Sequence, residues 1–466
     1  MASSYNNVFQ ESKALSDWKV NKLLLKLGIP IIISLLVGEL YNIVDTIYVG
    51  RAIGATAIGG LTIAYPIQRL TVAIGLLISV GASTAIGRNL GGGNYRKIRY
   101  IITNALTLMS VFIVIITALI YTFKTPLIYR LGATENIFPY ANDYISIIIL
   151  GSVFQCFTLM ISYIITALGD AKVGLTASII GAVSNILINY LLVILLSYGV
   201  KGAAISTVVS QVISAAYAFY HFLKIKVKFD ITFKFNLKKD IIVSILTVGF
   251  STFIVEMADA IVGVVLNNLL SSKGDIGIVI IGVTSKVSTF LYITVVGISF
   301  AMQPIVSYNY GAKNYNRVKE VLKKSITAVL VTSLLIWFIM ISFANPIISI
   351  FIRDKDVLQE AVNSFRIIIS LYPIIGVYFL IICYYQAIQE SKLSFLLSIY
   401  NQLIIFIPLA FVLVKILGSI GVWIAYPISD ILTMPITIYF IYKAYRQLDI
   451  SAREQESFVE SVPTSI

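Results

Sequence analysis

Long apolar stretches recur along almost the whole chain, and they limit its possible folds more than any other feature of the sequence. Hydrophobic residues make up 58% of the 466 residues and charged residues only 12%, and the mean hydropathy is +0.91. Each stretch has about 20 residues or more, which is the length that a helix needs to cross a bilayer. Because the stretches are continuously apolar rather than alternating, they favour helices over a transmembrane β-barrel. Twelve spans are expected, near residues 23–49, 54–86, 97–123, 139–168, 172–197, 200–223, 240–269, 277–304, 320–344, 358–388, 392–415 and 420–444.

The chain also repeats itself at a spacing of about 220 residues. Residues 89–95 read NLGGGNY and residues 309–315 read NYGAKNY, with the two asparagines, one glycine and the tyrosine identical. The same spacing pairs Pro126 with Pro346, and further matches follow toward the end of each half. An even number of spans per half returns the chain to its starting side, so both copies enter the membrane in the same orientation. This is the parallel-repeat organisation known in secondary transporters.

We therefore predict an all-α membrane protein with twelve transmembrane helices in two pseudo-symmetric six-helix bundles. The predicted divisions are a cytoplasmic N-terminal segment, an N-terminal lobe, a polar cytoplasmic linker, a C-terminal lobe and a disordered tail. The N-terminal segment covers residues 1–22 and the N-terminal lobe residues 23–224. The linker covers residues 225–239, the C-terminal lobe residues 240–446 and the tail residues 447–466.

The positive charges indicate how the chain is oriented. Most of its 35 lysines and arginines fall on one side of the predicted spans if both termini are cytoplasmic, as the positive-inside rule requires. Basic loops beside an anionic leaflet account for the net charge of +13, so nucleic acid is not an expected partner. We predict a monomeric, multi-pass protein of the cytoplasmic membrane.

Several classes of protein are disfavoured by what the sequence lacks. It has no G-x-x-x-x-G-K-[ST] loop, and therefore no ATP-driven motor of its own. His221 is the only histidine, and Cys156 and Cys383 lie in different spans, which excludes His-ligated zinc and bis-His haem sites. An intramembrane enzyme that uses Asp or Ser is not excluded by counting, although no paired motif indicates one. No cofactor is predicted.

Ionisable residues inside the spans are the main functional candidates, because each costs roughly 2.5–3.5 kcal/mol to insert. Span 1 contains Glu39 and Asp45, span 7 contains Glu256 and Asp259, and span 8 contains Lys286. An ion pair between Lys286 and one of the span 7 acids is one interpretation, and a purely structural clamp between helices is the alternative. For Asp45 the structural alternative is a backbone cap or a pair with a nearby arginine.

Uncharged polar and aromatic residues add a second set of candidates. Asn185 and Asn189 share one face of span 5, and Thr207 follows in span 6. Such groups commonly hold helices together through hydrogen bonds, at about 0.6 kcal/mol each. If these three residues are considered without Asp45, helix packing is the stronger interpretation. Aromatic rings can offer their faces to an organic cation, and Arg69 is a basic residue within a span. The aromatic candidates for a substrate cavity are Tyr41, Tyr65 and Tyr163.

Four motifs resemble those of the MATE (multidrug and toxic compound extrusion) family, and specifically its DinF-like branch. They read LYNIVDTIYVGRAIG in span 1, GRNLGGGNYRK after span 2, SNILINYLLV with GVKGAAISTVVSQ in spans 5 and 6, and MQPIVSYNYGAKNYNRVK after span 8. The resemblance covers roughly residues 20–445. It implies a two-lobed antiporter that exports organic cations or other amphipathic drugs in exchange for H⁺ or Na⁺.

The resemblance also implies roles for particular residues. Asp45 occupies the position of the span 1 acid that couples transport to an ion, with Asn185 and Thr207 as polar partners. Asn189 departs from the pattern, because many relatives carry an aspartate there. Glu256 or Asp259 falls near another cation site of the family, so coupling rests on Asp45, on span 7 or on both. A sodium ion would find oxygen ligands at Asp45.

The expected mechanism depends on the charge of Asp45. Protonation removes the cost of burying that charge and lets span 1 repack, while a cationic substrate favours the ionised carboxylate. Proton and drug then compete, which suffices for exchange if each binds the two access states unequally. A single carboxylate favours H⁺, although the sequence does not decide between the ions.

Two other functions are alternatives to drug export. One is a flippase for lipids or lipid-linked oligosaccharides in the same superfamily, which would need cationic side chains to meet phosphates. Only Arg69, Lys286 and Arg366 could serve in that way. The other is a non-transporting receptor or scaffold, which the duplication and the intramembrane acid disfavour.

Overall fold

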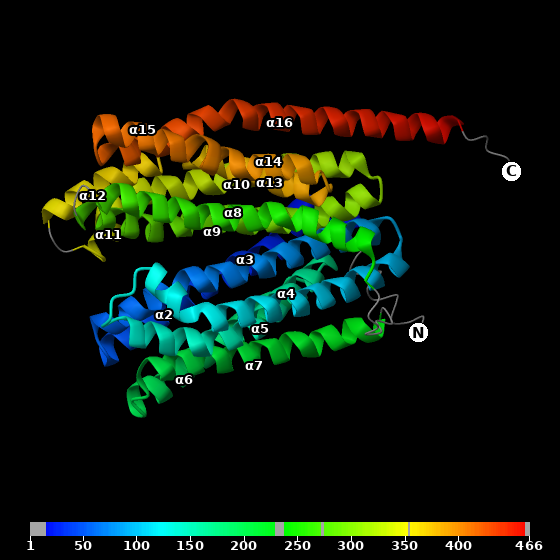
Figure 1. Ribbon diagram of the computed structural model, residues 1–466. Coiled ribbons are helices and arrows are strands. Elements are labelled where there is room, and N and C mark those ends of the chain that lie inside the picture. The colour runs from blue at the N-terminus through cyan, green and yellow to red at the C-terminus, as the bar shows by residue number, and fades with distance from the viewer. Residues whose placement is uncertain (1–14, 229–236, 272–274, 353–354, 462–466) are drawn as a thin grey trace. The chain divides into compact units, whose positions relative to one another are not determined.

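The computed structural model describes residues 15–228, 237–271, 275–352 and 355–461, and in these residues all regular secondary structure is helical. Figure 1 shows the helices running side by side within each half of the chain. In the first half the helices are α2 (Val20–Ala52), α3 (Ala55–Gly91), α4 (Tyr95–Arg130), α5 (Phe138–Ala167), α6 (Lys172–Asn189), the π-helix η1 (Tyr190–Leu195) and α7 (Gly199–Lys228). In the second half they are α8 (Lys239–Ser271), α9 (Asp275–Gly311), α10 (Tyr315–Ser342), α11 (Ala344–Ser349), α12 (Lys355–Ile368), α13 (Tyr372–Ala387), α14 (Ser391–Ile399), the π-helix η2 (Tyr400–Phe406), α15 (Ile407–Leu417) and α16 (Ile420–Ser461).

Eleven spans in the described residues are long and apolar enough to cross a membrane, and a bent pair of helices makes a twelfth. The bent pair is α12 and α13, which meet at an angle of 49°. Pro373 is the second residue of α13. It cannot donate the backbone hydrogen bond that a continuous helix would need, and it disfavours helical geometry in the residue before it. The predicted all-α, twelve-span fold is confirmed, with its tenth span broken.

The chain divides into two compact units whose limits differ from the predicted lobes. One unit contains residues 29–256, and the other contains residues 15–28 and 257–461 of the described chain. The division therefore falls within α2 and within α8, rather than in the polar segment between the predicted lobes. Residues 15–28 contact the rest of the second unit through a hydrogen bond from Asn309 Nδ2 to the carbonyl of Leu15, at 3.0 Å.

In the first unit, α5 packs against both α3 and α7, and α6 packs against α7. A buried apolar cluster holds these helices together, with Val49 from α2, Ile67 from α3, Ile145 from α5 and Ala204 from α7. In water, burial of a large aliphatic side chain stabilises a fold by about 1.5–3 kcal/mol. In a lipid bilayer, van der Waals contacts between closely packed helices contribute more to stability than the removal of apolar surface from water. The polar residues of this unit are thus held on a well-packed frame.

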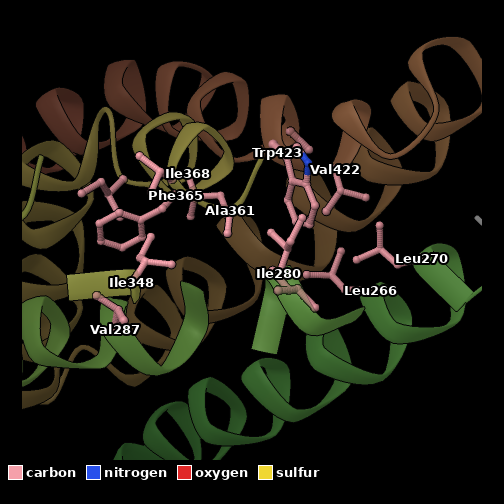
Figure 2. Close-up of a cluster of buried hydrophobic side chains, with 14 of the residues drawn as sticks. Leu266, Leu270, Ile280, Val287, Ile348, Ala361, Phe365, Ile368, Val422 and Trp423 are labelled. Atoms are coloured by element: carbon pink, nitrogen blue, oxygen red, sulfur yellow. The ribbon is translucent and has the colours of Figure 1, made fainter. Parts of the chain in front are cut away.

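In the second unit, α9 packs against α10 and α13, and α13 packs against α16. Figure 2 shows an apolar cluster whose side chains include Leu266 on α8, Ile280 on α9, Phe365 on α12 and Trp423 on α16. The ring of Trp423 lies beside the side chain of Val422 in this view. The cluster fixes the start of α16 against the broken tenth span.

The internal repeat is visible in the local geometry of each half. Asn94 and Asn314 cap α4 and α10, and each side-chain oxygen accepts a hydrogen bond of 3.2 Å from the backbone N–H three residues on. Further along, Phe123 and Phe343 have nearly the same non-helical backbone angles, with φ near −103° and −102°. Each precedes a proline by three residues. The duplicated sequence therefore encodes the same helix start and the same kink twice.

Two predicted boundaries are wrong. Residues 447–461 of the predicted disordered tail are helical, because α16 continues to Ser461, and residues 462–466 lie outside the described residues. Leu448 is buried in this helix, and Asp449 forms an ion pair of 2.6 Å with Lys319 on α10. Residues 225–228, predicted as linker, are the last turn of α7. Residues 229–236 of that linker lie outside the described residues.

Candidate functional site

Five helices of the first unit bring polar side chains together around Asp45. The carboxylate lies on α2 and is only 3% exposed. Asn189 Nδ2 donates to Asp45 Oδ1 at 2.5 Å, and Thr207 Oγ1 donates to Asp45 Oδ2 at 2.8 Å. Each carboxylate oxygen therefore accepts at least one hydrogen bond, although no lysine or arginine in the described residues pairs with Asp45. Among the described side chains, Asp45 is therefore a buried acid with polar partners and no counter-charge.

Asn185 completes the network around this carboxylate. Its Oδ1 accepts a hydrogen bond of 3.1 Å from Asn189 Nδ2, and its own Nδ2 donates to Thr207 Oγ1 at 3.2 Å. Both asparagines are fully buried and lie one turn apart on α6, as their spacing of four residues predicts. The structure thus brings the side chains of Asp45, Asn185, Asn189 and Thr207 together.

One oxygen of the network has no partner. Asn189 Oδ1 is buried and accepts no hydrogen bond from the residues that the structure describes. An unsatisfied buried acceptor costs about 1–3 kcal/mol, and such groups in a native structure call for an explanation. The π-helix η1 begins at the residue after Asn189, and π-helical turns occur often at functional sites.

The sequence interpretation missed two neighbours of Asp45. Tyr144 on α5 is buried and interacts with the Asp45 carboxyl, and Gln68 on α3 interacts with Tyr144. Gln68 also lines a small hollow between α3 and α5, together with Thr71, Ser152 and Gln155. Both residues are polar positions inside predicted spans, so a survey of uncharged polar residues in spans 2 and 4 would have found them.

A second polar cluster in the first unit surrounds Arg69 on α3. Its guanidinium lies 3.5 Å from a carboxylate oxygen of Glu39 and 3.6 Å from one of Glu256. Arg69 Nε also donates to the hydroxyl of Tyr65 at 2.7 Å, and its charge lies 5.1 Å from the centre of that ring. One positive charge faces two negative ones, so the cluster carries a formal charge of −1.

The described residues show no ion pair between Lys286 and the span 7 acids, which was one of the two interpretations of these residues. Glu256 pairs with Arg69 in the first unit. Asp259 belongs to the second unit, where it accepts a hydrogen bond from Gln402 Nε2. Lys286 is exposed on α9. The two acids therefore contact different partners, although they are only three residues apart on α8.

The remaining predicted cavity residues do not gather at Asp45. Tyr163 is half-buried on α5, 19 residues after Tyr144, a distance of roughly 28 Å along a helix. The ring of Tyr65 is already engaged by Arg69. The side chains of Tyr41, Asn42 and Arg51 lie outside the described residues, so the predicted role of Tyr41 and the alternative partner for Asp45 stay predictions.

Comparison with known proteins identifies relatives along nearly the whole chain. A family model described as MatE matches residues 30–191 and 257–412. The multidrug export protein MepA of Staphylococcus aureus is 22% identical over 439 residues, which cover 93% of this chain and 96% of MepA. MepA of Staphylococcus haemolyticus is 23% identical over 434 residues, covering 92% and 95% respectively.

Solved structures show the same fold. A crystal structure of a MATE protein in a bent conformation superposes with a TM-score of 0.88 at 22% identity, and covers 95% of this chain and 98% of the other. An outward-facing multidrug resistance MATE family transporter of the MOP superfamily gives a TM-score of 0.87 at 22% identity, with coverage of 94% and 98%.

Proposed function

Because this chain belongs to the MATE (multidrug and toxic compound extrusion) family of transporters, we propose that it exports organic cations and amphipathic drugs in exchange for a small cation. Membership of this family makes it a transporter rather than an enzyme. Its relatives named MepA are multidrug export proteins, which supports drugs as the substrate class. The proposed location is the cytoplasmic membrane, with both termini inside and one chain as the working unit. The DinF-like branch stays a prediction.

The observation that carries the proposal is the environment of Asp45. A buried carboxylate without a basic partner in the described residues is expensive inside a membrane protein. It becomes tolerable when a proton or another cation neutralises it. Loading and unloading of that cation can therefore bias the protein between two access states, provided that the cation binds the two states unequally. This is the requirement for a coupling site.

The amide of Asn189 suits a carboxylate whose charge changes. As described, its Nδ2 donates to both Asp45 and Asn185, an arrangement matched to an ionised acid. Protonated Asp45 would need an acceptor, and a half-turn of the amide would present Oδ1, which has no partner in the described residues. An asparagine can thus serve both protonation states where an aliphatic side chain could serve neither.

The same oxygens also fit the ligand preference of sodium. Asp45, Thr207, Asn185 and, after that half-turn, Asn189 would offer carboxylate, hydroxyl and amide oxygens, the hard ligands that such a cation prefers. Sodium would supply the neutralising charge that a proton supplies otherwise. We favour H⁺, because the site has a single carboxylate and three of its hydrogen bonds are complete without a metal.

The charge around Arg69 favours cationic substrates over phosphates. Two carboxylates offset its single positive charge, so the cluster is a poor partner for a lipid phosphate and a suitable one for an organic cation. Its side chains are between 20% and 37% exposed, which leaves them open to a ligand. This observation disfavours the lipid flippase, the second candidate function.

Ethidium transport in proteoliposomes tests the proposal. The protein is reconstituted, and either a pH gradient or a Na⁺ gradient is imposed in separate experiments. Uptake or efflux of ethidium against its gradient in one of them supports exchange and identifies the ion. No ethidium movement with either gradient, in protein shown to be folded, would reject drug export and favour a lipid-linked substrate.

A further inference from the structure

The small hollow between α3 and α5 continues the Asp45 site into the interior of the first unit. Its volume is about 10 Å³, roughly the smallest that accommodates one water molecule. Gln68 contacts the hydroxyl of Tyr144, and Tyr144 in turn hydrogen-bonds to the Asp45 carboxyl. A series of polar contacts therefore joins the buried acid to the hollow. The polar side chains that line it are Gln68, Thr71, Ser152 and Gln155.

Two glutamine amides extend these polar contacts beyond the hollow. The Oε1 atom of Gln155 accepts a hydrogen bond of 3.3 Å from Gln211 Nε2 on α7. Gln211 Oε1 is buried and accepts no hydrogen bond from the residues that the structure describes. A Cβ atom at Gly151 would lie 2.4 Å from this oxygen, so the glycine leaves the room that the amide occupies. A buried acceptor of this kind favours a water molecule as its partner.

The polar residues follow two parallel helices away from Asp45. Gln211 lies one turn beyond Thr207 on α7, and it ends the motif GVKGAAISTVVSQ. Gln155 lies eleven residues beyond Tyr144 on α5, a distance of roughly 16 Å along the helix. Both helices run from the predicted outer side to the predicted cytoplasmic side. The two glutamines are half-buried, so the polar residues lead from a buried acid toward partly accessible side chains on the cytoplasmic side.

The lining of the hollow limits what can pass through it. None of the described residues that line it is charged, and its apolar part consists of isoleucines. An organic cation is far too large for this volume, and a metal ion would find only neutral ligands. Neutral amides and hydroxyls suit water, which can transfer protons without any net movement of heavy atoms. The titratable groups beside the hollow are Tyr144 and the thiol of Cys156, which donates to the Thr71 carbonyl at 3.4 Å.

We propose that the hollow holds water through which protons leave Asp45 toward the cytoplasmic side, inside the first unit. Gln155 and Gln211 are positioning residues that hold this water. In the transfer, the O–H bond of the Asp45 carboxyl breaks as its proton passes to the hydroxyl oxygen of Tyr144. The original hydroxyl proton of Tyr144 passes to the water at the same time. Tyr144 is left unchanged, Asp45 becomes a carboxylate, and the positive charge leaves as H₃O⁺.

Turnover kinetics test this route, which rests on the proposed exchange function with H⁺ as the coupling ion. Full-length protein is reconstituted with an imposed pH gradient, and kcat, KM and the final accumulation ratio of ethidium are measured. Gln155→Leu should lower kcat by about tenfold, the factor that corresponds to the loss of about one hydrogen bond. KM and the accumulation ratio should stay unchanged, because a proton route affects the rate of exchange and not its equilibrium. Gln155→Asn keeps an amide and should restore most of the rate.

The second unit offers a matched control. Gln303 Nε2 on α9 donates to Gln386 Oε1 on α13 at 2.7 Å, so these residues form a second buried pair of amides. Gln303→Leu should therefore keep the wild-type kcat. An unchanged kcat in Gln155→Leu overturns the inference, and equal slowing in Gln303→Leu overturns it as a general effect of packing. Exchange driven by Na⁺ alone also overturns it, although the exchange function then stands.

The two native cysteines test the hydration of the hollow without any change to the route. Cys156 lies beside the hollow and Cys383 lies in the second unit, and both are 1% exposed. Infrared spectroscopy in D₂O follows the replacement of S–H by S–D, and Cys383→Ala assigns the two bands. Water in the hollow should make the Cys156 thiol exchange at least about tenfold faster than the Cys383 thiol.

Equal or slower exchange at Cys156 overturns the inference, even if Gln155→Leu fails to fold. Absence of ethidium movement by the wild type with either gradient would instead reject the exchange function. The infrared comparison does not depend on transport, so the two failures are distinguishable.

Discussion

Replacement of Asp45 by asparagine should abolish coupled exchange while leaving the protein folded. In the structure the carboxylate accepts one hydrogen bond on each oxygen. The substituted amide can accept on one side only, so one hydrogen bond to a charged group is lost, which costs about 1.5–3 kcal/mol. Removal of the buried charge returns roughly 2.5–3.5 kcal/mol. The two effects nearly cancel, and the variant should therefore insert and fold.

The effect on transport should be large, because an amide cannot take up a proton in this pH range. A pH difference of two units supplies about 2.7 kcal/mol per proton, which corresponds to at least a hundredfold ethidium accumulation for one coupled proton. Asp45→Asn should reduce that ratio to about one. Proteoliposomes measure the ratio, and size-exclusion chromatography with thermal denaturation in detergent checks folding.

A folded Asp45→Asn protein that still accumulates ethidium would refute the reasoning. Coupling would then have to rest on other acids, such as Glu256, Asp259 or Asp430. Glu320→Gln is a suitable control, since Glu320 forms surface ion pairs with Arg317 and Lys324 on α10. This variant should keep its accumulation ratio, because exposed pairs contribute about 0–1 kcal/mol.

Three further predictions follow from the fold and the Arg69 cluster. Asn94→Ala and Asn314→Ala should each destabilise the protein by about 0.5–2 kcal/mol through loss of a helix cap. Serine at either position should restore most of the melting temperature. Clearly different losses of stability in the two alanine variants would argue against equivalent caps. Arg69→Gln should lower the ethidium KM by up to about fivefold, because the two nearby carboxylates lose their counter-charge; loss of transport would favour a phosphate-bearing substrate. Amide hydrogens of residues 447–455 should exchange slowly, since α16 continues through them; rapid exchange there would restore the prediction of a disordered tail.

The sequence was sufficient to predict the fold because its main determinants are local and strong. Apolar runs long enough to span a bilayer leave few alternatives to helices, and the duplicated asparagine caps mark the same helix start in both halves. The broken tenth span was missed, although Pro373 indicates it. The helical tail was missed because its composition is polar, whereas its stability comes from the contacts of Leu448 and Asp449.

The Asp45 site was predictable for a similar reason. Its acid is conspicuous in an apolar helix, and the spacing of Asn185 and Asn189 places both amides on one face. Spacing along one helix could not predict partners on other helices. Glu256 and Asp259 share a face of α8, yet Glu256 pairs with Arg69 and Asp259 accepts a hydrogen bond from Gln402. Contacts between helices decide the pairing of a polar side chain, and they depend on packing that no local pattern encodes.

Asp430 is a buried acid that the sequence interpretation missed, although it lies within a predicted span. It is the single acid within the predicted span 420–444, so the rule that selected Asp45 also selects Asp430. Asn401 in the π-helix η2 hydrogen-bonds to its carboxyl and donates to Thr433 Oγ1 at 2.9 Å. Among the described residues, each half of the duplicated chain thus has a buried acid beside amide and hydroxyl groups, at different spans. The two halves therefore contain similar polar clusters at different positions of the repeat.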